Sequence, residues 1–418
     1  MSIKVRLTLM SFLQFFVWGA WLITIGTYCL NAKGWGFPEF GAIFSTLALS
    51  SLFMPAITGI IADKWMNAEK LYGLLHILYG IILLIVPQID SPDMFFYVIF
   101  AAMICYMPTI SLSNSIGYTV LKNNNFDVVK IFPPIRVFGT IGFVIAMWIT
   151  NFTHSNVNAN QFYIAAVAAF ILGVYSFSLP KCPPQRSIDE NATIFQKLGL
   201  DAFKLFVDYK MALFFLFSMF LGAALQLTNM YGDAFLNSFS ENPIYKNSFA
   251  TQNSTFIMSL SQISEILFIL TIPFFLKRFG IKQVMLISMF AWVLRFGFLA
   301  FGMPDGFGLI LILLSNIVYG MAFDFFNISG SLFVETTTDT KIRSSAQGLF
   351  MMMSNGLGAY LGSKASGYFI GKYFVKEGVS DWHNIWLAFA VYSLVIAILF
   401  AIFFKHKHNP DEVAQVAH

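Results

Sequence analysis

The chain has 418 residues, of which 57% are hydrophobic and only 11% are charged, and its formal net charge is +4. Soluble domains carry about 25% charged residues, so the composition excludes a disordered chain, a coiled coil and an ordinary water-soluble enzyme. A mean hydropathy of +0.71 leaves too little polar surface to cover the apolar mass in water. We therefore expect an all-α membrane protein that crosses the lipid bilayer many times.

Apolar stretches long enough to cross a bilayer, which takes about 20 residues, recur along the whole chain. We count twelve of them: 9–30, 40–62, 71–89, 94–121, 133–152, 162–180, 210–230, 254–276, 283–302, 307–334, 344–371 and 383–404. The first follows Lys4 and Arg6 and is not ended by a small-residue cleavage site. It is therefore expected to be an uncleaved transmembrane helix and not a signal peptide.

The longest polar interruption lies in the middle of the chain, at 181–209, and contains Pro183 and Pro184 near its start. It predicts an N-terminal six-helix bundle over 1–180, a cytoplasmic linker over 181–209, and a C-terminal six-helix bundle with a short cytoplasmic tail over 210–418. Two bundles of six helices around a polar linker are typical of transporters built from related repeats.

The basic residues indicate the orientation. If the N-terminus is cytoplasmic, eighteen of the 25 Lys and Arg residues fall on the cytoplasmic side, four on the other side and three within predicted helices. This is a strong positive-inside bias, which predicts that both termini are cytoplasmic. The positive net charge is thus a topology signal, and a nucleic-acid partner is not expected. Cys29, Cys105 and Cys182 lie in separate segments without metal spacing, so neither a metal nor a cofactor is expected.

A short motif follows the second predicted helix. Gly59, Asp63 and Lys64 lie in the segment GIIADKW, which resembles the Gly-x-x-x-Asp-Arg/Lys signature of the major facilitator superfamily. The resemblance implies a tight cytoplasmic turn in which Asp63 and Lys64 act as gating residues. A glycine turn with ordinary positive-inside charge would give the same pattern. The corresponding segment of the second half, 276–282, keeps the basic residues and lacks the Asp.

Longer blocks resemble the nucleoside:proton symporter family of this superfamily. They are 11–15 (SFLQF), 54–55 (MP), 62–65 (ADKW), 132–136 (FPPIR), 198–203 (LGLDAF), 269–275 (ILTIPFF) and 322–331 (AFDFFNISGS). The resemblance implies the major facilitator fold, with twelve transmembrane helices in two six-helix bundles. It also implies proton-coupled nucleoside import across a bacterial inner membrane by alternating access, without a cofactor and by a monomer in the lipid bilayer.

Ionisable residues inside spanning helices cost roughly 2.5–3.5 kcal/mol each on insertion scales and are functional candidates by default. They are few in this chain: Arg136, Glu265, Arg295, Asp324 and Lys364. Lys364 lies near the periplasmic end of its predicted helix, where its side chain can reach the interface. We assign it no function.

Two neighbouring predicted helices each carry a pair of polar residues at i and i+3, which places each pair on one helix face. The pairs are Gln226 with Asn229, and Gln262 with Glu265. Amide and carboxylate groups can match ribose hydroxyls, which both donate and accept hydrogen bonds. We expect a substrate-binding role, although polar groups also join membrane helices to one another.

Two further stripes are candidates for contacting the base. Arg136, Thr140 and Phe143 are spaced i, i+4 and i+7, and Tyr319 and Phe323 are spaced i and i+4. Aromatic rings can stack on a flat base, and the family resemblance implies nucleobase contacts at these positions. Two alternatives remain: aromatic stripes are common in apolar packing, and Arg136 could extend towards the cytoplasm from a helix that starts at Pro133 and Pro134.

A carboxylate in the membrane is needed to couple transport to protons, and two are available. Glu265 lies about halfway along its predicted helix and is our first candidate for proton coupling. Asp324 is the second candidate. Because Asp324 and Arg295 lie at similar predicted depths, the alternative hypothesis is that they form a structural ion pair.

Other functions stay open at this stage. A proton-coupled sugar or oligosaccharide symporter uses the same residue types, and a nucleoside sensor that does not transport is also compatible with the sequence. An enzyme is not expected, because His76 is the only histidine in the interior of a predicted span and has no clustered catalytic partner.

Overall fold

The computed structural model describes residues 2–184, 200–339 and 342–407 and groups the chain into two compact units, Met1–Ala192 and Thr193–His418. Most of the predicted linker, including Arg186, Asp189 and Glu190, lies outside the described residues, as do Leu198 and Gly199 of one family block. The boundaries expected at 180 and 210 stay a prediction. Each unit is described by itself.

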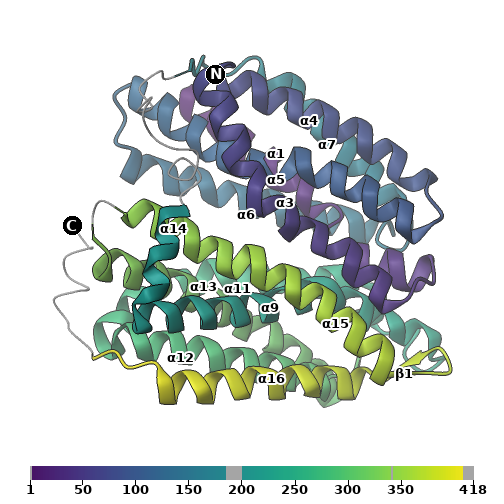
Figure 1. The fold of residues 1–418 in the computed structure, drawn as a ribbon. Coiled ribbons are helices and arrows are strands. Elements are labelled where there is room, and N and C mark those ends of the chain that lie inside the picture. The colour runs from purple at the N-terminus through teal and green to yellow at the C-terminus, as the bar shows by residue number, and fades with distance from the viewer. Residues whose placement is uncertain (1, 185–199, 340–341, 408–418) are drawn as a thin grey trace. The chain divides into compact units, whose positions relative to one another are not determined.

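All secondary-structure elements in the described part of the N-terminal unit are helices (Figure 1). Its elements are α1 (Ile3–Gly19), α2 (Ile25–Thr27), the π-helical η1 (Tyr28–Ala32), α3 (Phe37–Lys64), α4 (Ala68–Ile85), η2 (Val86–Gln88), α5 (Pro92–Asn123), α6 (Val128–Phe152) and α7 (Asn160–Ser176).

Among the described residues of the C-terminal unit, the secondary structure is helical apart from one small hairpin. Its elements are η3 (Leu200–Val207), α9 (Tyr209–Ser238), η4 (Phe239–Glu241), α10 (Phe249–Gln252), α11 (Ser254–Ile269), α12 (Ile272–Ala300), α13 (Gly306–Thr337), α14 (Arg343–Met351), the π-helical η5 (Met352–Gly358), α15 (Ala359–Tyr373), β1 (Val375–Lys376), β2 (Val379–Ser380) and α16 (Trp382–Phe403). The antiparallel hairpin pairs Val375 with Ser380 and Lys376 with Val379. Glu377 and Gly378 between the strands both have positive φ, 51° and 81°, as a two-residue type I′ turn requires.

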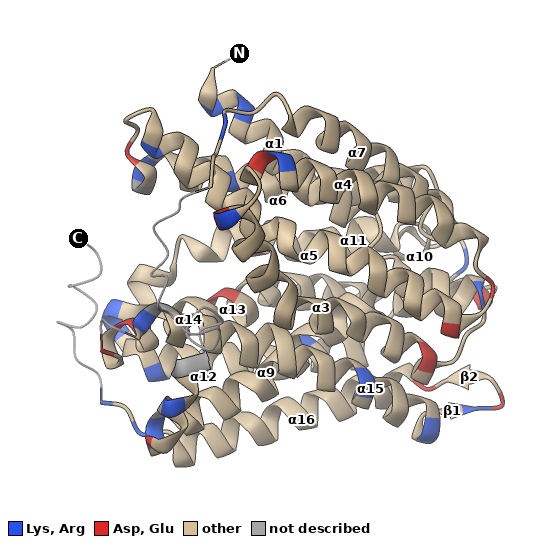
Figure 2. Cartoon of the chain, turned by 45° about the horizontal axis from the view of Figure 1, so that its top comes forward, with Lys and Arg blue, Asp and Glu red and all other residues tan. Residues whose placement is uncertain are grey.

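The all-helical membrane class predicted from composition is confirmed. Among the described residues, eight helices are long and apolar enough to cross a membrane, and α7 and α11 are shorter apolar helices. Every one of the twelve predicted stretches overlaps helix in the structure, and the number of crossings stays a prediction. Figure 2 shows Lys, Arg, Asp and Glu concentrated near helix ends and connections, which leaves the middle of most helices uncharged.

Helix α6 begins earlier than the sequence suggested. Asp127 is its N-cap and accepts a hydrogen bond from the Lys130 backbone N–H at 3.2 Å. Capping of this kind satisfies a donor that a helix start would otherwise leave unpaired. Pro133 and Pro134 therefore lie inside the helix and do not start it.

Two other helix ends also differ from expectation. Asp63 and Lys64 lie in the last turn of α3, so the predicted turn motif is helical up to Lys64. At the corresponding place in the second half, Gly280 has φ 77° and ψ 171° and divides α12 into two helical parts. A positive φ of this kind is available to Gly at little cost.

Close helix crossings at glycine hold the site-bearing helices in place. On α6, a Cβ at Gly142 would collide with the Phe12 carbonyl of α1. On α13, a Cβ at Gly320 would lie 2.6 Å from the Ser264 carbonyl of α11. Small residues at crossings let membrane helices approach closely. These contacts fix α6 against α1, and α13 against α11.

Candidate substrate-binding site

The residues predicted on α6 face α1. The Arg136 guanidinium lies 3.9 Å from the centroid of the Phe15 ring, a cation–π contact. Phe143 is buried, and its ring meets Trp18 edge-on, with centroids 6.2 Å apart. Thr140 lies between them along the chain and is half-buried. The guanidinium of Arg136 therefore lies against a ring of α1, and the alternative that Arg136 extends towards the cytoplasm stays open.

A buried amide next to this face was missed by the sequence reasoning. Gln14 is 0% exposed. Its side chain donates to Thr109 Oγ1 at 2.9 Å and accepts from the Tyr72 hydroxyl at 2.6 Å, while the Tyr106 hydroxyl donates to the Gln14 carbonyl at 2.7 Å. These bonds fix α1 against α4 and α5. The available signal was an amide inside an apolar span, within the family block 11–15.

In the C-terminal unit, the predicted polar residues lie on helices that pack against each other. Helix α11 contacts both α9 and α13. Gln226 and Asn229 on α9, and Gln262 and Glu265 on α11, are all half-buried. Such partial burial leaves polar groups accessible while limiting their exposure to solvent.

Tyr319 of α13 lies at the centre of the charged groups in this unit. Its hydroxyl is hydrogen-bonded to the Gln262 side chain, and Glu265, Arg295 and Asp324 are near enough to interact with it electrostatically. Its ring lies parallel to that of Phe323, with an interplanar angle of 1° and centroids 5.9 Å apart. The structure thus places Gln262, Glu265 and Phe323 around Tyr319, and their role in substrate binding stays a prediction.

The hypothetical ion pair between Arg295 and Asp324 is not formed among the described residues. Arg295 is 1% exposed; its guanidinium donates to the Ser315 carbonyl at 2.9 Å and to Ser261 Oγ at 3.2 Å, and it lies over the Tyr319 ring at 4.3 Å. The guanidinium is thus hydrogen-bonded to Ser261 and Ser315 and lies over the Tyr319 ring, and similar depth did not reveal these partners.

Asp324 is instead a buried carboxylate next to a second one. It is 5% exposed, and its Oδ2 atom has no hydrogen-bond partner within the described part of the chain. Glu265 is close enough to interact with it electrostatically. Two neighbouring carboxyl groups in a membrane interior resist simultaneous ionisation.

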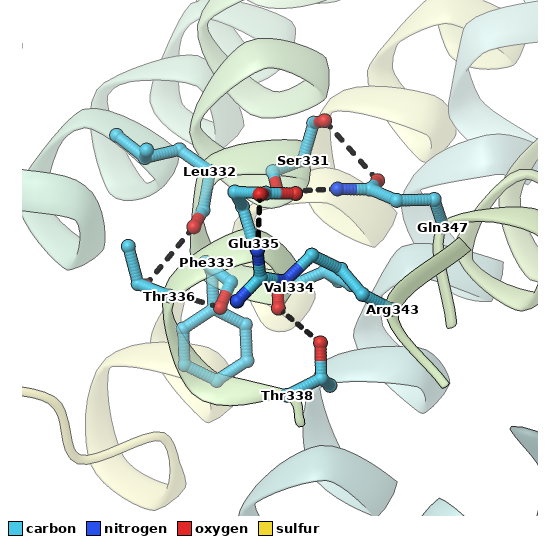
Figure 3. A network of polar contacts seen from close by, with 9 residues as sticks. All are labelled: Ser331, Leu332, Phe333, Val334, Glu335, Thr336, Thr338, Arg343 and Gln347. Atoms are coloured by element: carbon cyan, nitrogen blue, oxygen red, sulfur yellow. Dashed lines mark hydrogen bonds and ion pairs between the residues drawn. The ribbon is translucent and has the colours of Figure 1, made fainter. Parts of the chain in front are cut away.

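Polar residues lie at helix ends in both units: the predicted gating residues in the N-terminal unit and a hydrogen-bonded set in the C-terminal unit. Asp63 and Lys64 are exposed at the end of α3. In the C-terminal unit, Arg343 donates to the Glu335 carboxylate at 2.8 Å, and Gln347 donates to the Ser331 carbonyl at 2.7 Å (Figure 3). Both hydrogen bonds run from α14 to α13. A polar network therefore ties these helix ends together.

Two remaining candidates play no part in this arrangement. Lys364 is exposed on α15, with its amino group 3.5 Å from the Tyr360 hydroxyl. Within the described ranges, no group of three His, Cys, Asp or Glu side chains could hold a metal ion.

Comparisons with known proteins agree with this arrangement of helices. The family model described as "Nucleoside H+ symporter" matches residues 1–409. Xanthosine permease of Escherichia coli K12 is 50% identical over 413 residues, which cover 99% of this chain and 98% of the permease. Nucleoside permease NupG of the same organism is 48% identical over 408 residues, 98% of this chain and 97% of that protein.

Solved structures give the same result. A crystal structure of the nucleoside transporter NupG has a TM-score of 0.91 at 47% identity and covers 97% of this chain and 100% of that one. A POT family transporter at 13% identity, with a TM-score of 0.72, shares the fold. This chain belongs to the nucleoside H+ symporter family of membrane-embedded transporters.

Proposed function

We propose that the protein imports nucleosides together with protons across the bacterial inner membrane by alternating access. It would do so as a monomer with twelve transmembrane helices in two six-helix bundles, 1–180 and 210–418, and with both termini in the cytoplasm. The family match over residues 1–409 supports the reaction. The positive-inside bias of the basic residues supports the orientation.

The observation that carries the proposal is the cluster around Tyr319, in which hydrogen-bonding and protonatable side chains meet an aromatic face. We assign Gln226, Asn229, Gln262 and Glu265 to the ribose, whose hydroxyls both donate and accept hydrogen bonds. Tyr319 and Phe323 would stack on the base.

The N-terminal unit would contribute a second set of contacts. Arg136 and Thr140 are assigned to the polar edge of the substrate and Phe143 to its flat face. The guanidinium of Arg136 is already oriented by the ring of Phe15, which lowers the entropy cost of ordering it around a ligand.

Glu265 is the proposed proton-coupling residue, with Asp324 as its neighbour in the proton path. Asp324 Oδ2 has no hydrogen-bond partner among the described residues, so protonation there breaks no existing bond. One proton moving through 100 mV supplies about 2.3 kcal/mol. At about 1.4 kcal/mol per factor of ten, this supports roughly fifty-fold accumulation of a neutral solute. Asp63 and Lys64 would bridge helix ends in one transport state.

A competition experiment tests the substrate class. A strain lacking its own nucleoside transporters and expressing this protein should take up labelled uridine or adenosine, and unlabelled nucleosides should block this uptake while disaccharides do not. Equal inhibition by lactose would favour a proton-coupled sugar or oligosaccharide symporter. Binding of nucleosides by purified protein without uptake would favour a sensor that does not transport.

A further inference from the structure

We propose that Arg295 of α12 is a positioning residue for the substrate site, which holds Tyr319 in place for contact with a nucleoside without touching the nucleoside itself. The inference rests on the proposed nucleoside transport and deepens it, because it assigns a role to a buried charge that the proposed function leaves unused.

An arginine in this place is expensive. The Arg295 side chain is 1% exposed, forms no ion pair within the described ranges, and leaves its Nε atom there without a hydrogen-bond partner. A buried, unpaired charge inside a membrane protein costs more free energy than a few hydrogen bonds between membrane helices return. Joining α12 to its neighbours therefore does not account for a charged residue, since an amide or a hydroxyl would join them at lower cost.

Two side chains of α12 hold the ring of Tyr319 on α13. The Arg295 guanidinium lies over this ring, 4.3 Å from its centroid, and the Trp292 ring meets it edge-on, with centroids 5.9 Å apart. Trp292 and Arg295 are spaced i and i+3, so they lie on one face of α12. A cation over an aromatic face is attracted to it, most strongly where water is excluded. Arg295 therefore occupies one face of Tyr319, and a base can stack only against the other.

Arg295 also joins the two helices that carry Gln262 and Tyr319. The guanidinium donates to the Ser315 carbonyl of α13 at 2.9 Å, and both of its terminal nitrogens donate to Ser261 Oγ of α11 at 3.2 Å. Gln262 follows Ser261 directly, and its side chain is hydrogen-bonded to the Tyr319 hydroxyl. The guanidinium thus fixes the rotation of α11 at the point where Gln262 reaches Tyr319.

The role of Arg295 is therefore indirect. Because its side chain is almost fully buried, a ligand beside Tyr319 and Gln262 meets those two side chains and not the guanidinium. The effect of Arg295 on the ligand must then pass through Tyr319. A residue that only stabilised the fold would act equally well without that ring.

The test is a double-mutant cycle between Arg295 and Tyr319. Unlabelled adenosine displaces labelled adenosine from the full-length protein in lipid nanodiscs, over concentrations high enough to measure a weakened site. Arg295→Gln removes the cation and should weaken adenosine binding about tenfold, as the loss of a cation–π contact in a dry site predicts. In a Tyr319→Leu background, the same replacement should change the affinity less than about twofold, because the coupled ring is gone.

Arg278→Gln is the matched control. Arg278 lies on the same helix, with its guanidinium 5.6 Å from the centroid of the Phe279 ring, but its side chain is exposed. This variant should bind adenosine as the wild-type protein does. If Arg295→Gln does not fold, Ser261→Ala takes its place in the cycle, because it removes the α11 partner of the guanidinium and keeps the charge. It should weaken binding about threefold, the value of an average hydrogen bond between membrane helices, and only when Tyr319 is present.

Two results would overturn the inference. An equal loss of affinity with and without the Tyr319 ring would mean that Arg295 only stabilises the fold. Unchanged adenosine affinity in folded Arg295→Gln would mean that it plays no part in the site. Both results leave nucleoside binding by the wild-type protein intact. Failure of the wild-type protein to bind any nucleoside would instead remove the proposed function itself, so the two failures are distinguishable.

Discussion

Replacing Gly142 with alanine is expected to destabilise the N-terminal unit and weaken substrate binding at the same time. Gly142 lies where α6 crosses α1, and an added Cβ would collide with the Phe12 carbonyl. The obstacle is backbone, which cannot rotate away as a flexible side chain could. The two helices must therefore separate, and Arg136 and Phe143 on α6 must move with them.

The magnitude follows from two opposing effects. Overpacking a tightly packed site costs about 1–3 kcal/mol, whereas the higher helix propensity of Ala over Gly returns about 1 kcal/mol. We therefore expect a net loss of up to about 2 kcal/mol. Gly297→Ala on α12 is the matched control, because no atom lies within 4 Å of the Cβ it would add.

The assay is thermal unfolding of both variants in detergent, followed by tryptophan fluorescence, together with the KM for labelled uridine. Gly142→Ala should lower the unfolding temperature and raise the KM, and Gly297→Ala should do neither. Equal unfolding temperatures for the two variants would refute the argument that backbone contact at this crossing positions α6.

Two further predictions concern charged groups. Hydrogen bonds from the Asn384 side chain and backbone N–H to the Asp381 carboxylate hold the pKa of Asp381 below its usual value. Because the pKa is lower in the folded protein than in the unfolded chain, the ionised carboxylate stabilises the fold above about pH 4, the ordinary carboxyl pKa. This stabilisation is lost as the pH falls through the pKa of the folded state. The difference in unfolding temperature between the wild-type protein and Asp381→Ala should therefore shrink on acidification, and a constant difference would contradict this. For Arg295 and Asp324, the double variant Arg295→Gln with Asp324→Asn should give no higher folded yield than the single variants, because the guanidinium is bonded to other groups. A higher folded yield of the double variant would support the hypothesis that the two residues form an ion pair.

The sequence was sufficient for features that depend on the length and polarity of segments. Apolar runs of about 20 residues located helix along the chain, and i and i+3 spacing placed Gln262 and Glu265 on one face of α11. The i and i+4 spacing also placed Tyr319 and Phe323 on one helix face, and their rings are parallel in the structure.

The direction in which a side chain leaves its helix, and local changes in backbone geometry, could not be predicted from the sequence. Depth alone suggested that Arg295 would meet Asp324, whereas the direction of its side chain is set by Ser261 and Ser315 on neighbouring helices. The stretch 344–371 looked like one continuous span, and nothing in its composition indicated a π-helical segment.

The start of helix α6 was also not predicted. Pro133 and Pro134 suggested a first turn, but the cap formed by Asp127 lies six residues before Pro133 and starts the helix there. Asp is a preferred N-cap residue, so Asp127 before Val128 and Val129 was the signal that could have located this start.

The most direct test of the account is concentrative uptake of labelled uridine into proteoliposomes under an imposed proton gradient. The wild-type protein should accumulate uridine up to roughly fifty-fold for the energy of one proton through 100 mV, and a protonophore should abolish this. Glu265→Gln should still exchange uridine across the membrane but should not accumulate it, whereas Glu241→Gln, an exposed carboxylate, should behave as the wild-type protein. Uridine accumulation by the wild-type protein that does not depend on the proton gradient would contradict the account. Full uridine accumulation by Glu265→Gln would also contradict it.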